Sequence, residues 1–132
     1  MSDTQKSEGT VRRWRFDIPV DAGALSPNKN MRNHQARARI TREHRDAAWM
    51  TWRAAGKPRT THRVRLDAII CRYGALDPTN RWACLKAIVD GICIGALTPN
   101  DTASNVQAGE VGLVNSKGYL LRPHVIIIAT EL

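Results

Sequence analysis

The stretch from residue 34 to residue 55 contains neither glycine nor proline and is rich in alanine and arginine. Gly56 and Pro58 follow it, and these residue types are typical of the end of a helix. The pattern predicts one long basic helix. The segments on both sides of it alternate apolar and polar residues, which is the two-residue period of a strand. The chain is therefore expected to combine helices with a sheet.

Two alternating segments predict strands with one buried face. Within residues 11–20, the apolar positions are Trp14, Phe16 and Ile18. Within residues 62–73, the apolar positions are Val64, Leu66, Ala68 and Ile70. Both segments are thus expected to lie in one half-covered sheet.

The rest of the chain predicts a helix and two strands. The helix is expected over residues 80–94, after a turn that contains Pro78, because proline is tolerated in a first helical turn. The strands are expected over residues 105–114 and 119–130, joined as a hairpin, with the apolar run near the end buried on both faces. The predicted fold is an α/β (α+β) domain over residues 11–132, with a small mixed sheet, two main helices and the order β-α-β-α-β-β. A disordered leader, residues 1–10, is expected to precede it.

Composition argues against a membrane protein or a secreted one. None of the apolar runs approaches the roughly 20 residues of a membrane helix, and residues 1–10 are polar. The three cysteines, Cys71, Cys84 and Cys93, have neither a C-x-x-C pair nor the spacing of zinc ligands. Cys84 and Cys93 are expected to be small core residues, and a reducing, cytoplasmic compartment fits the three cysteines best.

Positive charge is concentrated in one part of the chain. Lys and Arg number 20 against 12 Asp and Glu, which gives a net charge of +8. Residues 29–65 contain eleven basic residues and two acidic ones, Glu43 and Asp46, so this segment alone carries +9. Such a segment suits a polyanion such as nucleic acid, although a solvated basic face would give the same pattern.

Possible metal ligands gather around the second predicted helix. Asp77 lies before it, Asp101 lies in the turn after it, and Thr79, Lys86 and Asp90 have the spacing of one helix face. Oxygen ligands hold Mg²⁺ or Mn²⁺, which activate water for attack on a phosphodiester, and a lysine stabilises the developing charge. Ordinary roles explain the same residues as a helix cap, a surface ion pair and a turn.

Three segments in fixed order carry a resemblance to a known family. They are L-D-P-T-N at residues 76–80, L-K-A-I-V-D-G-I at 85–92 and G-A-L-T-P-N-D at 95–101, followed by Val106. They resemble the RusA-type Holliday-junction resolvases, whose pattern is D-x-D-N at a helix start, a lysine in the helix, and a turn that ends in D-D before a valine. Ile18-Pro19 and L-S-P-N at 25–28 look like the family's amino-terminal region. The resemblance extends from about Phe16 to Thr130.

The resemblance implies an endodeoxyribonuclease of DNA recombination and repair, of the kind phages and prophages carry. Such enzymes are homodimers that need Mg²⁺ or Mn²⁺ and resolve four-way DNA junctions by paired symmetric nicks. The resemblance implies that the catalytic residues are Asp77, Lys86 and Asp101, and that the metal ligands are drawn from Asp77, Asp90, Asp101 and Thr79. It gives a function in DNA binding to residues of the loop and the basic helix, namely Asn28, Arg32, His34, Arg37, Arg39, Arg42 and Arg45.

Two positions depart from the family's pattern. Thr79 stands where the family has its second aspartate, and Asn100 replaces the first acid of the final pair. The loss of two carboxylates lowers the expected metal affinity, so a module that binds junctions without cutting them is an alternative. A third hypothesis, an RNA-binding or ribosome-associated protein, rests on the charge alone.

The tryptophans of the long basic helix allow two interpretations. Trp49 and Trp52 are expected to pack in the core or in a dimer interface, because apolar residues at helical spacing usually pack. The alternative is that they stack on unpaired bases.

Overall fold

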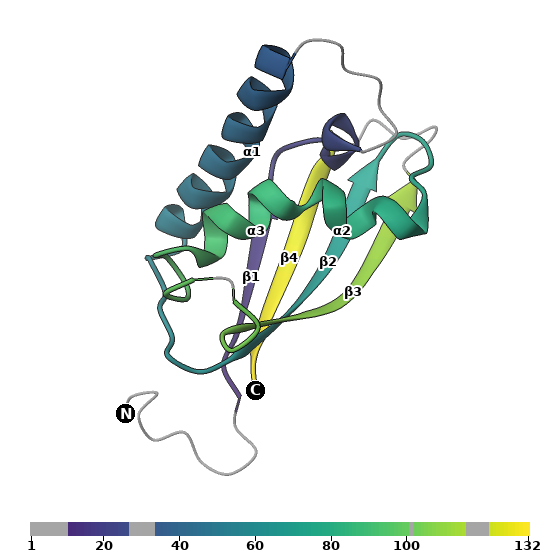
Figure 1. The fold of residues 1–132 in the computed structure, drawn as a ribbon. Helices are drawn as coiled ribbons and strands as arrows, with labels where there is room; N and C mark the ends of the chain where they lie inside the picture. The colour runs from purple at the N-terminus through teal and green to yellow at the C-terminus, as the bar shows by residue number, and fades with distance from the viewer. Residues whose placement is uncertain (1–10, 27–33, 101, 116–121) are drawn as a thin grey trace.

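The computed structural model describes residues 11–26, 34–100, 102–115 and 122–132. It consists of a four-stranded mixed sheet with helices packed on it (Figure 1). The strands are β1 (Arg13–Ile18), β2 (Val64–Arg72), β3 (Val106–Asn115) and β4 (His124–Glu131). The helices are α1 (His34–Ala54), α2 (Arg81–Cys84) and α3 (Lys86–Cys93), with short 3-10 helices η2 (Ala22–Leu25) and η3 (Pro78–Asn80). The predicted α+β class with a small mixed sheet is confirmed, and the expected leader lies outside the described residues.

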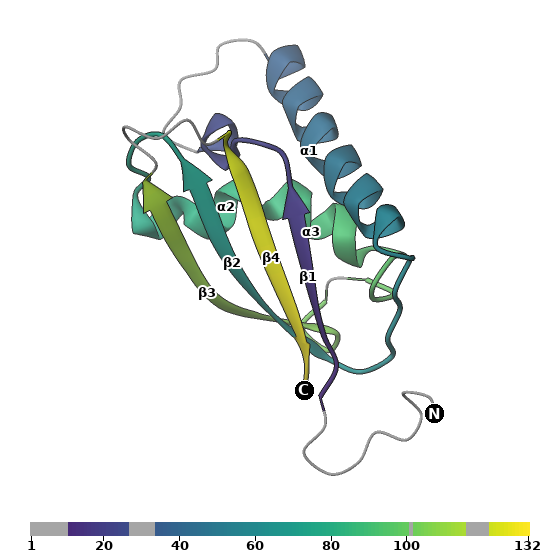
Figure 2. The same ribbon diagram turned by 180° about the vertical axis from the view of Figure 1, so that it is seen from behind.

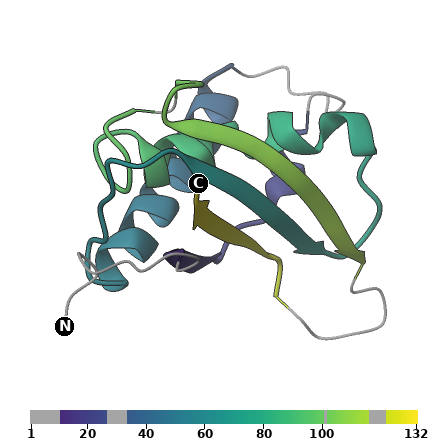
Figure 3. The same ribbon diagram turned by 90° about the horizontal axis from the view of Figure 1, so that it is seen from below.

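The order of strands in the sheet is β1-β4-β2-β3. β4 pairs antiparallel with both β1 and β2, while β3 pairs parallel with β2. Figure 3 shows β2 and β3 running side by side as a curved pair. The expected hairpin between the last two strands is wrong, because β2 lies between them. The side chains explain the order: Val125, Ile127 and Ala129 of β4 are fully buried, whereas every residue of β3 keeps some exposure and suits an edge.

Among the described residues, the helices cover one face of the sheet. α2 and α3 cross in front of the strands in Figure 1, α1 lies to the side against α3 and β1, and the view from behind shows the strands uncovered (Figure 2). Along β4, Val125, Ile127 and Ala129 point into the core, while Ile126 and Ile128 are half-buried on the open face. The expectation that this run is buried on both faces is therefore wrong.

The second predicted helix is present but divided. η3, α2 and α3 follow one another, and the break between α2 and α3 lies at Leu85, whose φ is −100° and ψ is −1°. The N–H of Leu85 donates to the carbonyl of Trp82, three residues back, at 3.0 Å. This tighter turn accommodates two adjacent residues, Cys84 and Leu85, that are both fully buried. The single continuous helix over residues 80–94 was thus correct in position and wrong in continuity.

The core lies between the sheet and the helices. Its largest fully buried side chains include Phe16, Ile70, Leu85, Ile88 and Ile127. Cys84 and Cys93 are buried thiols, as expected, Cys71 is buried as well, and burial raises the pKa of the Cys84 thiol. Within the ranges described, the helices are too short or too polar to cross a bilayer.

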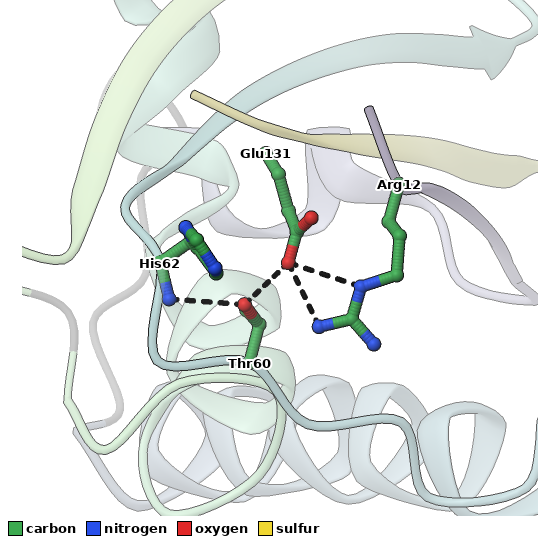
Figure 4. A network of polar contacts seen from close by, with 4 residues as sticks. All are labelled: Arg12, Thr60, His62 and Glu131. Carbon is green, nitrogen blue, oxygen red and sulfur yellow. Dashed lines mark hydrogen bonds and ion pairs between the residues drawn. The ribbon is translucent and has the colours of Figure 1, made fainter. Parts of the chain in front are cut away.

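A buried carboxylate ties the first strand to the last (Figure 4). Glu131 Oε2 accepts hydrogen bonds from Arg12 Nη2 at 2.9 Å, from Arg12 Nε at 3.1 Å and from the Thr60 hydroxyl at 2.6 Å. The Thr60 oxygen accepts in turn from the backbone N–H of His62 at 3.0 Å. Because the Glu131 side chain is fully buried, these donors compensate a charge that would otherwise be costly to bury.

Candidate nucleic-acid interface and metal site

One side of α1 is buried and the others face solvent. Its buried residues are His44, Ala48 and Trp52, and the helix packs against α3 and β1. The four-residue spacing places the three side chains on one face of the helix. The arginines on the other sides of the helix therefore remain available to a partner.

The exposed side near the start of α1 forms an open hollow of about 470 Å³, which we call the basic hollow. It is lined by His34, Arg37, Ala38, Thr41, Arg42 and Arg45. None of these lining residues is acidic, so the positive potential of the arginines is not neutralised within the hollow. A surface of this kind fits the phosphates of a nucleic-acid backbone.

The structure sorts the sequence-predicted DNA-binding residues into three groups. It brings together His34, Arg37, Arg42 and Arg45 in the basic hollow. It separates Arg39, which lies outside the hollow with its Nε 3.8 Å from Glu43 Oε1. Asn28 and Arg32 lie outside the described residues.

Asp77 caps the short helix η3. Its Oδ1 accepts hydrogen bonds from the backbone N–H of Thr79 at 3.0 Å and from the Thr79 hydroxyl at 2.9 Å. These two bonds hold the pKa of the Asp77 carboxyl below its ordinary value. Asp77 and Thr79 are both exposed, so the structure places the first expected ligand and its neighbour together at the surface.

Lys86 and Asp90 form an ion pair on α3. Lys86 Nζ lies 2.8 Å from Asp90 Oδ1, one turn of helix apart. Lys86 also lines a hollow of about 270 Å³ with Trp82, Val89 and three residues of β2 and β3, namely Leu66, Val106 and Ala108. The expected face shared by Lys86 and Asp90 is thus confirmed, and the lysine is paired with the acid rather than with Asp77.

Asn100 forms part of a turn through its side chain. Its Oδ1 accepts from the Thr102 backbone N–H at 3.1 Å, the Thr102 hydroxyl at 2.7 Å and Asn105 Nδ2 at 2.7 Å. This oxygen is already well supplied with donors and is a poor candidate for a metal ligand. Asp101, the next residue, lies outside the described residues.

Asp77 and the turn that contains Asn100 lie at opposite ends of the sheet. Asp77 follows the carboxyl end of β2, whereas the turn that contains Asn100 and Thr102 precedes β3, which begins beside the start of β2 at the pair Val64–Val106. Asp77 caps η3, whereas Asp90 lies on α3, and α2 separates the two elements along the chain. Within the described part of the chain, groups of three or more His, Cys, Asp or Glu side chains able to hold a metal ion are absent.

The basic hollow and Asp77 lie at the same end of the sheet. Arg37 Nη2 donates to the carbonyl of Leu25 in η2 at 3.3 Å. Asp21, which caps η2, accepts from Arg72 Nε at the end of β2 at 3.0 Å. Asp77 follows β2 by five residues. Phosphates bound at the start of α1 would therefore lie on the side of the molecule that presents Asp77.

Another hollow, the α1–α3 cleft, was not expected from the sequence. It measures about 360 Å³ and is lined by Arg45, Asp46, Trp49, Asp90, Gly91 and Ile94. Arg45 lines both this cleft and the basic hollow. The spacing of Arg45, Trp49 and Arg53, four residues each, was the available signal, because it places an aromatic side chain between two arginines on one face.

Comparison of the chain with protein-family models gives no match, and a search of curated proteins gives none either.

Proposed function

We propose that this protein binds branched DNA through the basic hollow and cleaves it as a metal-dependent endodeoxyribonuclease. Its substrate is the four-way (Holliday) junction, and the products are paired symmetric nicks. A homodimer supplies the two sites, since a two-fold axis would place identical sites on opposite strands. Three buried free thiols are compatible with action in the cytoplasm of a bacterial host, where such DNA occurs.

The observation that carries this proposal is the position of an exposed carboxylate at the same end of the sheet as a basic surface. The arginines of the hollow bind phosphates without base specificity, as expected for recognition of a DNA shape. Asp77 lies at the same end of the sheet and stays ionised, because Thr79 donates to it and lowers its pKa. The family resemblance of residues 76–101 assigns the same aspartate to metal binding.

The residues at the Asp77 end of the sheet fit a magnesium ion that the protein and the substrate phosphates coordinate together. Mg²⁺ is commonly bound by one or two carboxylates together with waters and substrate phosphates. Among the described residues, the hydrogen bonds to Asp77 reach Oδ1, which leaves Oδ2 for an ion. When bound, the ion would supply an activated water for hydrolysis of a phosphodiester. Asp77 would hold it and the arginines would orient the DNA.

A DNA-binding module without cleavage activity is the second candidate. The observation that favours it is the separation of Asp77 from the turn at Asn100, together with the pairing of Lys86 with Asp90. In this case the basic hollow still binds the phosphates of DNA. Asp77 only caps η3, and Asp90 only pairs with Lys86.

Cleavage of a labelled junction distinguishes the two candidates. The protein is incubated with a four-way junction or a linear duplex, at fixed salt, with Mg²⁺, Mn²⁺ or EDTA. Paired nicks in the junction alone, lost in EDTA and in Asp77→Asn, are expected for the nuclease. Tight junction binding without cutting in either metal would establish the second candidate.

The salt dependence of binding tests the hollow itself. Arg42→Gln is expected to weaken junction binding and to lower the slope of log K against log salt by about 1, because one phosphate contact is lost. Arg39→Gln is the matched control, since Arg39 lies outside the hollow on the same helix. Equal effects of the two substitutions would contradict a specific phosphate path along the hollow.

A further inference from the structure

The α1–α3 cleft combines an exposed aromatic ring with charges of both signs. Trp49 is 40% exposed and Ile94 is 51% exposed, although both lie beside the tightly packed contact between α1 and α3. The other large residue of this helical segment, Trp52, is 2% exposed and belongs to the core. The two tryptophans, equivalent by sequence, are thus separated by the structure into a core residue and a surface residue.

The ring of Trp49 is held in place. The guanidinium carbon of Arg53 lies 5.0 Å from its centroid, and the ring of Trp52 lies 6.4 Å away at an interplanar angle of 37°. An aromatic surface held in this way loses little conformational entropy when a planar ligand stacks on it.

The cleft continues the basic hollow. Arg45 lines both, so a DNA strand whose phosphates follow the hollow reaches the cleft at that residue. Beyond Arg45 the lining changes from a largely basic one without acidic residues to one that contains Trp49, Ile94 and the carboxylates Asp46 and Asp90. Carboxylates repel a phosphate but accept hydrogen bonds from the N–H groups of a base. The composition of the cleft therefore fits the base of a nucleotide whose phosphate lies at Arg45.

We propose that the α1–α3 cleft is a binding site for an unpaired nucleobase. The base stacks on Trp49 and against Ile94, Asp46 offers an acceptor for its N–H groups, and Arg45 and Arg53 hold the flanking phosphates. This proposal rests on the proposed function, because it names the part of a branched DNA that the protein recognises beyond its backbone. Stacking on an aromatic side chain tolerates any base, so the site selects unpaired bases over paired ones.

The test compares two DNA junctions with the same number of phosphates, one fully paired and one with a single unpaired nucleotide at the branch point. Binding is measured in EDTA at fixed salt, so that cleavage does not interfere. The wild-type protein is expected to bind the junction with the unpaired nucleotide more tightly. Trp49→Ala is expected to reduce that preference by about fivefold or more, and Trp49→Phe to retain most of it.

Met50→Ala is the matched control, because Met50 is 57% exposed, follows Trp49 on the same helix and does not line the cleft. Thermal melting of each variant shows whether the fold survives the loss of the Trp49 contact with Trp52. An unchanged preference in a folded Trp49→Ala variant would overturn the inference, and so would a change in oligomeric state without a change in preference. Failure of the DNA binding on which both candidate functions depend looks different, because the wild-type protein would then bind neither junction, and loss of cleavage alone is read from the separate junction-cleavage assay.

Discussion

Gly91 of α3 packs directly against the backbone carbonyl of Arg45 in α1. A Cβ placed on Gly91 would lie closer to that oxygen than real Cβ atoms approach, and 2.9 Å from the Cβ of Ala48. The absence of a side chain at residue 91 is therefore what allows the two helices to approach. The same contact sets the floor of the α1–α3 cleft and the position of Arg45 between the cleft and the basic hollow.

Gly91→Ala is expected to destabilise the protein by at least about 1–3 kcal/mol, the usual cost of inserting a methyl group into a packed interface. The neighbouring atom is backbone, which cannot rotate away as a side chain would. Urea denaturation measures the change. Gly112→Ala is the control, since a Cβ there meets nothing within 4 Å, and equal stability of the two variants would contradict the close packing.

Sequence periodicity located β1, β2 and α1 because each has one buried face with a regular repeat. Phe16 and Ile18 in β1 and Val64 to Ile70 in β2 follow the two-residue period and are buried. Sequence periodicity does not predict how the strands pair. A polar turn shows where the chain changes direction, but it does not show which strands become neighbours in the sheet. β4 lies between β1 and β2, where Val125, Ile127 and Ala129 are buried. This pairing depends on residues far apart in the sequence, so local periodicity does not reveal it.

The candidate site was predictable only in part, for a similar reason. The spacing of Lys86 and Asp90 is a local property of a helix, and the structure pairs them. Whether Asp77 meets the turn at Asn100 depends on the direction of β3, and a parallel β3 places them at opposite ends. The exposure of Trp49 and the burial of Trp52 likewise depend on where α3 packs.

Arg12→Ala is expected to lower the free energy of unfolding at neutral pH by about 3 kcal/mol, because the fully buried carboxylate of Glu131 loses two charged hydrogen bonds. Arg15→Ala, three residues further along in β1, removes the exposed pair with Asp17 and should change stability far less. Chemical denaturation measures both. The double variant Arg12→Ala/Glu131→Met should recover much of the loss, and a double variant as unstable as Arg12→Ala would show that burial of the unpaired charge was not the cause.

Stability is expected to fall on mild acidification because of His44. Burial lowers its pKa, against the smaller opposing effects of Asp21 and Glu43, and its Nδ1 has no hydrogen-bond partner among the described residues. The folded state thus protonates His44 less readily than the unfolded chain does, in which a histidine has a pKa of about 6.5. The contribution of neutral His44 to the free energy of unfolding is complete above that pH. It is lost as pH falls through the lower pKa of the folded state.

Denaturation of His44→Leu at pH 5 and pH 7.5 checks this origin. The variant removes the titrating group, so its stability should differ less between the two pH values than that of the wild type. The exposed His62→Gln should keep the dependence of the wild type. If the stability of His44→Leu depends on pH as strongly as that of the wild type, groups other than His44 cause the dependence.

Thr79→Asp is expected to lower the Mg²⁺ concentration needed for junction cleavage by about tenfold or more, because an added carboxylate strengthens an oxygen site for a divalent cation. The substitution also removes a hydroxyl that donates to Asp77 Oδ1 and places a second negative charge two residues from it. Both changes should raise the pKa of Asp77 in the absence of metal. A bound cation would then stabilise the two neighbouring carboxylates more than it stabilises Asp77 alone.

Thr79→Asn is the matched control, since it offers a neutral oxygen without the charge. Cleavage against Mg²⁺ concentration, with Mn²⁺ binding to the free protein as a readout independent of activity, measures the shift. If Thr79→Asp and Thr79→Asn respond alike in both measurements, the metal does not bind at Asp77.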